Sequence, residues 1–310
     1  MTYLSEAPIV GVTSIFYPDP RDVRFEVALE TMEGWSDRGI PVVVIDGSPV
    51  NERGVDVAKK AFEERGAVVL RSEVDGIASQ RQQGARHVLA EGGQKIITHE
   101  PEKPSIPGIA LEIGRLLDSA EIVVIGRTEE SKQTMPTLQR RTEGLAGWIL
   151  ERTLLLPPDA LAGPRGYSKR GMGHLLNYPS HEPGMNNWLY MYENLLQAKK
   201  AGQRILGFAA PLMYPQSITT QETNSPIFDR KRYEQFVGQL RYMLALPEAG
   251  KSGSESERLA TEVRMMLAGL SSDPTNEEYA EFIQNTEIRM REGGYNAWPM
   301  VITAAPQTYS

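Results

Sequence analysis

Five short apolar runs alternate with longer amphipathic segments over the first 127 residues, and this alternation constrains the fold more than any other feature. The runs are residues 9–16, 41–46, 67–72, 95–100 and 121–127. Between them, apolar residues recur every three or four positions over 24–39, 52–66, 77–93 and 106–120, which predicts helices. Strands that alternate with helices pair in parallel through right-handed crossovers. We therefore expect an α/β fold around a mostly parallel sheet.

The pattern changes after residue 130. We expect a long helix over 135–155, a glycine-rich loop or lid over 161–187, a helix over 188–202 and a strand over 204–214. Further helices are expected over 229–246, 256–269 and 274–292, with a polar connection at 247–257. The prediction is a sheet domain over residues 1–217 and a helical C-terminal extension over 218–310 packed on it.

Composition excludes several classes of protein. A net charge of −7 over 310 residues disfavours a nucleic-acid binder, which usually carries a basic face. The absence of cysteine excludes disulfides and thiolate chemistry, and it fits a reducing compartment. We see neither a signal-peptide pattern nor an apolar run of the roughly 18 residues that a membrane span needs. The expectation is a soluble cytoplasmic protein.

Two carboxylates, Glu100 and Glu102, follow the fourth apolar run in the segment THEPEK. Pro101 cannot extend a sheet ladder, so the strand should stop near Thr98. The acids then lie at the carboxyl end of a strand, where ligands bind in open α/β sheets. Because side chains alternate, Glu100 and Glu102 can face the same side and bind a hard cation such as Mg²⁺ or Mn²⁺. The alternative is a solvated turn.

Other segments fit around this acidic loop in a recognisable order. The loop at 12–19 follows the first strand, and the second strand ends in Asp46-Gly47-Ser48. The helix before the acidic loop carries Gly76, Arg81 and Gly84, and LAGPRGYSKRG follows at 161–171. Over roughly residues 8–215 this order resembles the GT-A glycosyltransferases, nucleotide-sugar transferases of the family 2 type. Here Glu-Pro-Glu stands in place of the usual Asp-x-Asp.

The resemblance implies a UDP- or GDP-sugar donor, a divalent cation, Mg²⁺ or Mn²⁺, and a set of site residues. The metal ligands would be His99, Glu100, Glu102 and His181. The donor would be bound by Thr13, Asp46, Gly76, Arg81, Lys103, Tyr167 and Arg170. The catalytic residues would be Arg165, Lys169 and Glu182, with Glu182 as general base. Simpler interpretations stay open: Asp46 as a turn residue, and Arg81 as a helix surface cation.

The expected function is transfer of a sugar to a hydroxyl of a small polar acceptor. The basic loop at 165–170 suits an anionic acceptor. Asn186 and Asn187 stand where the family often carries its base, so a retaining reaction assisted by the leaving phosphate is the alternative to Glu182. A sugar-nucleotide nucleotidyltransferase and a non-catalytic nucleotide- or sugar-binding module also remain open. The C-terminal helices could cover the acceptor site or form a homodimer contact.

Overall fold

The structure, a computed structural model, describes residues 3–17, 19, 21–48, 57–182, 185, 187–223, 225–251, 253–292 and 307–309. The expected helix over 52–66 is therefore described only from residue 57 onward. Asn186 lies outside the described residues.

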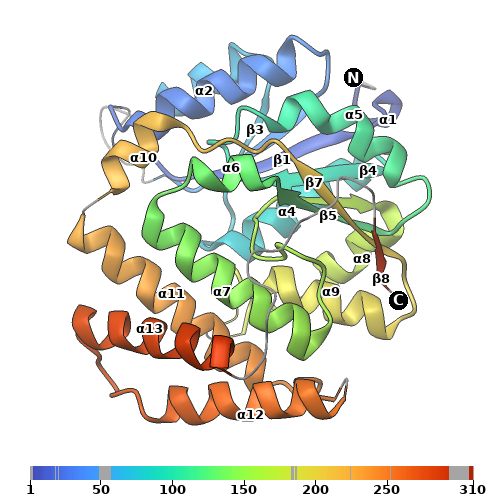
Figure 1. Cartoon of the computed structure of the whole chain (residues 1–310). Coiled ribbons are helices and arrows are strands. Elements are labelled where there is room, and N and C mark those ends of the chain that lie inside the picture. The colour runs from blue at the N-terminus through green and yellow to red at the C-terminus, as the bar shows by residue number, and fades with distance from the viewer. Residues whose placement is uncertain are drawn as a thin grey trace.

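An eight-stranded sheet in the order β3-β2-β1-β4-β6-β5-β7-β8 forms the centre of the molecule (Figure 1). The strands are β1 (Val10–Ile15), β2 (Val42–Asp46), β3 (Val68–Arg71), β4 (Lys95–His99), β5 (Ile122–Arg127), β6 (Arg165–Ser168), β7 (Ile205–Ala210) and β8 (Gln307–Tyr309). Neighbours pair in parallel, except that β6 is antiparallel to β4 and β5, and β8 is antiparallel to β7. The predicted α/β class and mostly parallel sheet are confirmed.

Helices cover both faces of the sheet, which explains why strand residues of either parity are apolar. Val44 and Ile97 belong to the core under α2 (Val23–Ser36), α3 (Val57–Glu63) and α5 (Ile106–Leu116). Val12 and Ile45 belong to the opposite core. That core is covered by α4 (Ile77–Ala90), α7 (Thr137–Leu154), α8 (Lys169–Asn177) and α9 (Tyr190–Lys200). The short helix α1 (Tyr3–Glu6) precedes β1, and the short helices α6 (Glu129–Gln133) and α10 (Gln216–Glu222) lie in connections between longer elements.

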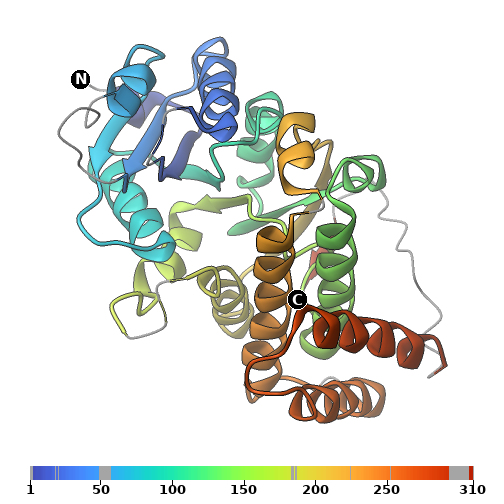
Figure 2. The same cartoon turned by 90° about the vertical axis from the view of Figure 1, so that its left-hand side faces the viewer.

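Three C-terminal helices extend the second core. They are α11 (Pro226–Ala245), α12 (Ser254–Ala268) and α13 (Asn276–Glu292), and α11 and α12 pack on α7. Figure 2 shows them grouped beside α7, at the end of the molecule away from the N-terminal strands. Buried residues such as Phe236 and Phe282 join the same cluster as the sheet residues. No helix in the described part of the chain is long and apolar enough to span a membrane.

The prediction of a loop or lid over residues 161–187 is wrong for the middle of this stretch. It contains β6, which is inserted between β4 and β5, and then α8. Its glycine content misled the prediction. Gly166 is needed for close packing, because a Cβ there would lie 2.6 Å from the Ile113 side chain.

Candidate functional site

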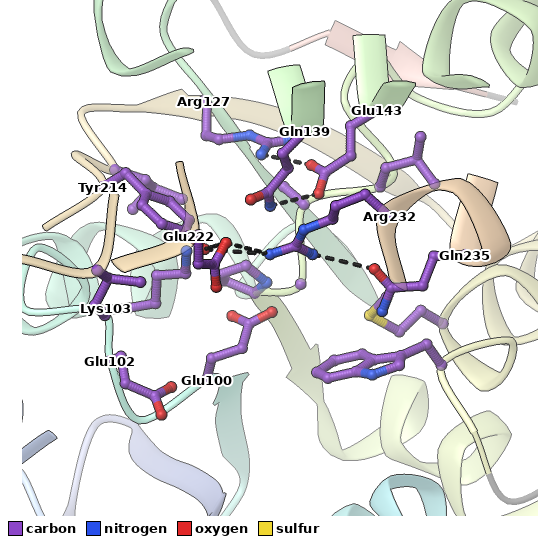
Figure 3. Close-up of a pocket in the computed structure, with 18 of the residues that line it drawn as sticks. Glu100, Glu102, Lys103, Arg127, Gln139, Glu143, Tyr214, Glu222, Arg232 and Gln235 are labelled. Carbon is purple, nitrogen blue, oxygen red and sulfur yellow. Dashed lines mark hydrogen bonds and ion pairs between the residues drawn. The ribbon is translucent and has the colours of Figure 1, made fainter. Parts of the chain in front are cut away.

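The acidic loop follows β4 at the point where the order of strand addition reverses. The chain builds β1, β2 and β3 outward and then returns to place β4 on the other side of β1. Ligands of open α/β proteins bind outside the carboxyl ends of the strands at such a switch point. Glu100, Glu102 and Lys103 follow β4 there and line a cavity of about 250 Å³ (Figure 3).

Glu100 is built to keep a free carboxylate in this cavity. Its Oε2 atom is buried and has no hydrogen-bond partner among the described residues. Gly163, which precedes β6, leaves the room for it, because a Cβ at Gly163 would lie only 1.6 Å from Glu100 Oε1. An unpaired buried carboxylate is costly unless a cation or donor meets it. The position is therefore suited to a ligand that carries positive charge.

Glu102 is held by a hydrogen-bond chain that links three strand ends. The Tyr17 hydroxyl donates to Glu102 Oε1 at 2.7 Å. The Tyr17 N–H donates to Ser48 Oγ at 2.9 Å, and the Ser48 N–H donates to Asp46 Oδ1 at 2.8 Å. Burial raises the pKa of Glu102, although the Tyr17 hydrogen bond opposes this. The loops after β2, β1 and β4 are thus fixed relative to one another.

Arg127, at the end of β5, organises the wall of the cavity that comes from β5 and α7. Its guanidinium donates to Asp159 at 2.9 and 2.6 Å and to Glu143 Oε2 at 2.7 Å. Gln139 Nε2 donates to Glu143 Oε1 at 2.6 Å. Burial alone would lower the pKa of Arg127, but Asp159 and Glu143 raise it well above its usual value. The Arg127 guanidinium therefore stays protonated, and its positive charge is already balanced by the Asp159 and Glu143 carboxylates.

Helices α10 and α11 supply a similar pair. Arg232 Nη2 donates to Glu222 Oε2 at 2.8 Å, and Nη1 donates to Gln235 Oε1 at 3.1 Å. Lys103 lies over the Tyr214 ring with its Nζ atom 4.6 Å from the ring centroid, and has no carboxylate partner among the described residues. Figure 3 shows these groups around one space, with Glu100 and Glu102 on one side and the arginines on the other.

The structure brings three of the predicted residues, Glu100, Glu102 and Lys103, into the cavity. It does not bring His99 there. The His99 ring packs on Trp35 with centroids 5.4 Å apart and does not line the cavity. Burial and the Arg81 charge lower the pKa of His99 to about 3. The neutral ring is part of the core, so the structure gives no support to the expected role of His99 as a metal ligand.

Arg81 and Thr13 hold strand ends together and do not line the cavity. The buried Arg81 guanidinium donates to the carbonyl oxygens of Val12 and His99. Thr13 Oγ1 also donates to the His99 carbonyl, at 2.9 Å. Both side chains therefore act beneath the acidic loop, and the idea of Arg81 as a helix surface cation is wrong. A direct contact of either with the donor is not supported.

The four residues expected in a basic lid lie elsewhere. Arg165 is fully buried in β6 and donates to the carbonyls of Ala160, Ala162 and Pro164, and Tyr167 is fully buried in the core. Since β6 runs antiparallel, Ser168 lies opposite Lys95, the first residue of β4. Lys169 and Arg170 therefore begin α8 at the edge of the sheet opposite the cavity. None of the four lines the cavity, so the geometry gives no support to their expected catalytic and binding roles or to the anionic acceptor inferred from them, and these stay predictions.

The remaining predicted residues are not in the cavity. His181 and Glu182 are exposed and do not line it. Asp46 caps its own Asp-Gly-Ser turn, and its Oδ2 lies 3.6 Å from Arg71. Gly76 opens α4 with φ of 106°, which favours glycine. Across the described ranges, no group of three or more His, Cys, Asp or Glu side chains is placed to hold a metal ion. Two carboxylates are nevertheless enough for Mg²⁺ when substrate phosphates complete its coordination.

Sequence reasoning missed the wall opposite the acidic loop, formed by Arg127, Glu143, Glu222 and Arg232. Arg127 carried a signal, because it ends an apolar run just as Glu100 does. Glu143, Glu222 and Arg232 lie on ordinary amphipathic helices, where charged residues usually face solvent. Only the packing of α10 and α11 against the sheet domain reveals them.

Comparison with known proteins gives structural matches only. No family model matches the chain, and no curated protein matches its sequence. The mannosyltransferase PcManGT from Pyrobaculum calidifontis, solved with GDP-Man and Mn²⁺, is 13% identical with a TM-score of 0.49, covering 93% of this chain and 77% of that one. The M. tuberculosis glucosyl-3-phosphoglycerate synthase is 14% identical with a TM-score of 0.47, covering 80% and 84%.

A third similar structure is that of S. aureus TarS residues 1–349, with 11% identity, a TM-score of 0.45, and coverage of 97% of this chain and 96% of that one. At these identities and TM-scores, the likeness does not assign an activity to this chain. The activity has to be argued from the cavity.

Proposed function

We propose that this protein is a glycosyltransferase that moves a sugar from a nucleotide-diphosphate donor to a hydroxyl group of a small polar acceptor. The observation that carries the proposal is the pair Glu100 and Glu102, presented by one loop at the switch point of the sheet beside Lys103. Departure of a nucleoside diphosphate builds negative charge, which a divalent cation and a lysine can offset.

The donor set fits Mg²⁺ or Mn²⁺. Glu100 offers a buried carboxylate oxygen that has no partner within the described ranges, and Glu102 offers a second carboxylate on the same loop. Bound there, the cation would supply charge stabilisation for the leaving diphosphate. Lys103 would contact the diphosphate oxygens, and Tyr17 would keep Glu102 oriented through its hydrogen bond.

The nucleoside would lie over the ends of β1 and β2. Phe16, directly after β1, is 61% exposed, which is unusual for a large apolar side chain and suits stacking on a base. Asp46 ends β2, and Ser48 follows it in the turn at the same edge of the sheet. We infer that this edge binds the nucleoside and the acidic loop binds the diphosphate.

The test is metal-dependent hydrolysis of UDP-glucose and GDP-mannose, because a transferase leaks sugar slowly to water. We expect turnover that needs Mn²⁺ or Mg²⁺ and that is lost in Glu102→Gln. Glu112→Gln is the matched control, since Glu112 is exposed on α5 and lies outside the cavity. If neither donor is bound or hydrolysed with either cation, or Glu102→Gln keeps full activity, the proposal is wrong.

A second assay, which follows pyrophosphate release, separates the two alternatives from a glycosyltransferase. A nucleotidyltransferase would release pyrophosphate from a nucleoside triphosphate and a sugar 1-phosphate, and a binding module would turn over neither substrate. The nucleotidyltransferases of this type carry a glycine-rich loop after the first strand, whereas residues 14–22 contain no glycine. The sequence of this loop therefore favours the glycosyltransferase.

A further inference from the structure

Apart from Lys231, which also lines the cavity and has no carboxylate partner among the described residues, the wall opposite the acidic loop carries little free charge. We call it the inner wall and define it as Arg127, Gln139, Glu143, Glu222, Arg232 and Gln235. Each arginine is matched within the protein, Arg127 by Asp159 and Glu143, and Arg232 by Glu222. An anionic ligand gains little from arginines that are already paired. The inner wall thus differs from the acidic loop, where Lys103 has no carboxylate partner among the described residues.

Two buried polar atoms of the inner wall have no hydrogen-bond partner in the described part of the chain. Gln139 is 6% exposed, and its Oε1 atom accepts no hydrogen bond from the described residues. Its orientation is fixed, because the amide nitrogen donates to Glu143 at 2.6 Å. Arg232 Nε is a buried donor that has no acceptor among the residues the structure describes. Buried polar atoms are normally satisfied, so each such exception needs an explanation.

A ligand with uncharged hydroxyl groups would satisfy both atoms, because a hydroxyl donates and accepts at once. Trp188 lines the same cavity and offers an apolar ring surface, a further feature of carbohydrate sites. We propose that the inner wall binds the hydroxyl groups of an uncharged sugar or polyol, with Gln139 as a specificity-determining residue.

The hydroxyl groups could belong to the donor's sugar or to the acceptor, and the choice between these two ligands rests on the proposed function. Binding of a sugar to the inner wall does not depend on the proposed function, because a free sugar can be tested without nucleotide. Loss of donor hydrolysis and loss of sugar binding are therefore separate outcomes.

The experiment measures binding of free glucose, mannose and glycerol, and of the anions glycerate and glycerol 3-phosphate, by saturation-transfer NMR. We expect at least one uncharged ligand to bind more tightly than its anionic counterpart. Gln139→Met should weaken that binding about tenfold, the effect of one lost hydrogen bond to a buried group. Gln203→Met is the matched control, because Gln203 is also buried but lies outside the cavity.

Competition experiments with nucleotides show whether the inner wall binds the donor's sugar or the acceptor. Displacement of the sugar by UDP-glucose or GDP-mannose but not by UDP or GDP assigns the inner wall to the donor's sugar, and binding that survives donor saturation assigns it to the acceptor. Either outcome supports the proposal. Tighter binding of the anions, or an affinity unchanged in Gln139→Met, overturns it. Gln235→Met, with an expected loss of affinity in the same direction, replaces Gln139→Met if that variant does not fold.

Discussion

A single methyl group at Gly163 should test the role of Glu100 without touching Glu100 itself. In Gly163→Ala the new Cβ would lie 1.6 Å from Glu100 Oε1, whereas ordinary contact begins near 3.4 Å. The carboxylate must therefore move by about 1.8 Å. The atom displaced is the far end of a flexible side chain, so the free energy of unfolding should change by less than about 1 kcal/mol.

A carboxylate displaced this far no longer meets a cation held at Glu102. Small displacements of site groups typically cost on the order of 10- to 100-fold in metal affinity or rate. We therefore expect Mn²⁺ binding in the presence of UDP or GDP, measured by calorimetry, to weaken by roughly that factor. Urea unfolding of the same variant should stay close to the parent chain.

Two further variants separate this explanation from a general packing effect. Gly173→Ala adds a methyl group on α8 where no atom lies within 4 Å, so it should leave Mn²⁺ affinity unchanged. In a Glu100→Ala background, Gly163→Ala should have no additional effect, because its partner is already gone. Unaltered Mn²⁺ affinity in Gly163→Ala, or an equal loss in the Glu100→Ala background, would refute the reasoning.

Four other perturbations give distinct outcomes. Tyr17→Phe removes the 2.7 Å hydrogen bond to Glu102, so calorimetry should show Mn²⁺ binding about tenfold weaker. Phe16→Ala should raise the donor KM about tenfold in the hydrolysis assay through lost base stacking, and an unchanged KM would remove Phe16 from the nucleoside site. Lys169→Ala should leave turnover within about twofold, since Lys169 lies at the opposite edge of the sheet. Because burial lowers the pKa of His99 to about 3, the unfolded chain takes up a proton below pH 6.5 that the folded chain refuses, so stability present at pH 7 is lost on acidification. Urea unfolding at pH 7 and 4.5 should show a loss of about 3 kcal/mol more in the parent chain than in His99→Asn, and equal losses would contradict this.

The N-terminal half of the fold could be predicted because each strand and helix there has its own periodic signal. Pro101 ends β4 and places Glu100 and Glu102 on a loop, so the acidic side of the cavity was also predictable. The short strand β6 was not. Its four residues carry no alternation long enough to recognise, and Gly166 resembles a loop residue until Ile113 is seen packed against it.

Lys169 and Arg170 were misplaced because the sequence does not show in which direction a strand runs through the sheet. Lys169 and Arg170 are a few residues from Gly163, which lines the cavity, yet an antiparallel strand carries them to the other edge of the sheet. Arg232 shows the opposite case. It is remote in sequence from Glu100, and only the packing of α11 against α7 brings it to the same cavity.

The position of β6 also decides how the molecule holds together. Four strands lie on one side of β6 and three on the other, so this four-residue strand joins the two halves of the sheet. We call this junction the seam. Glu100 belongs to one half and Arg127 to the other, so opening of the seam would separate the two sides of the cavity. Arg165, fully buried and bonded to three carbonyls beside the cavity, fastens the chain where it enters that seam. The amide protons of β6 should therefore exchange with solvent only when the whole sheet opens. Their protection would report whether the two halves of the sheet, and with them the two sides of the cavity, stay together.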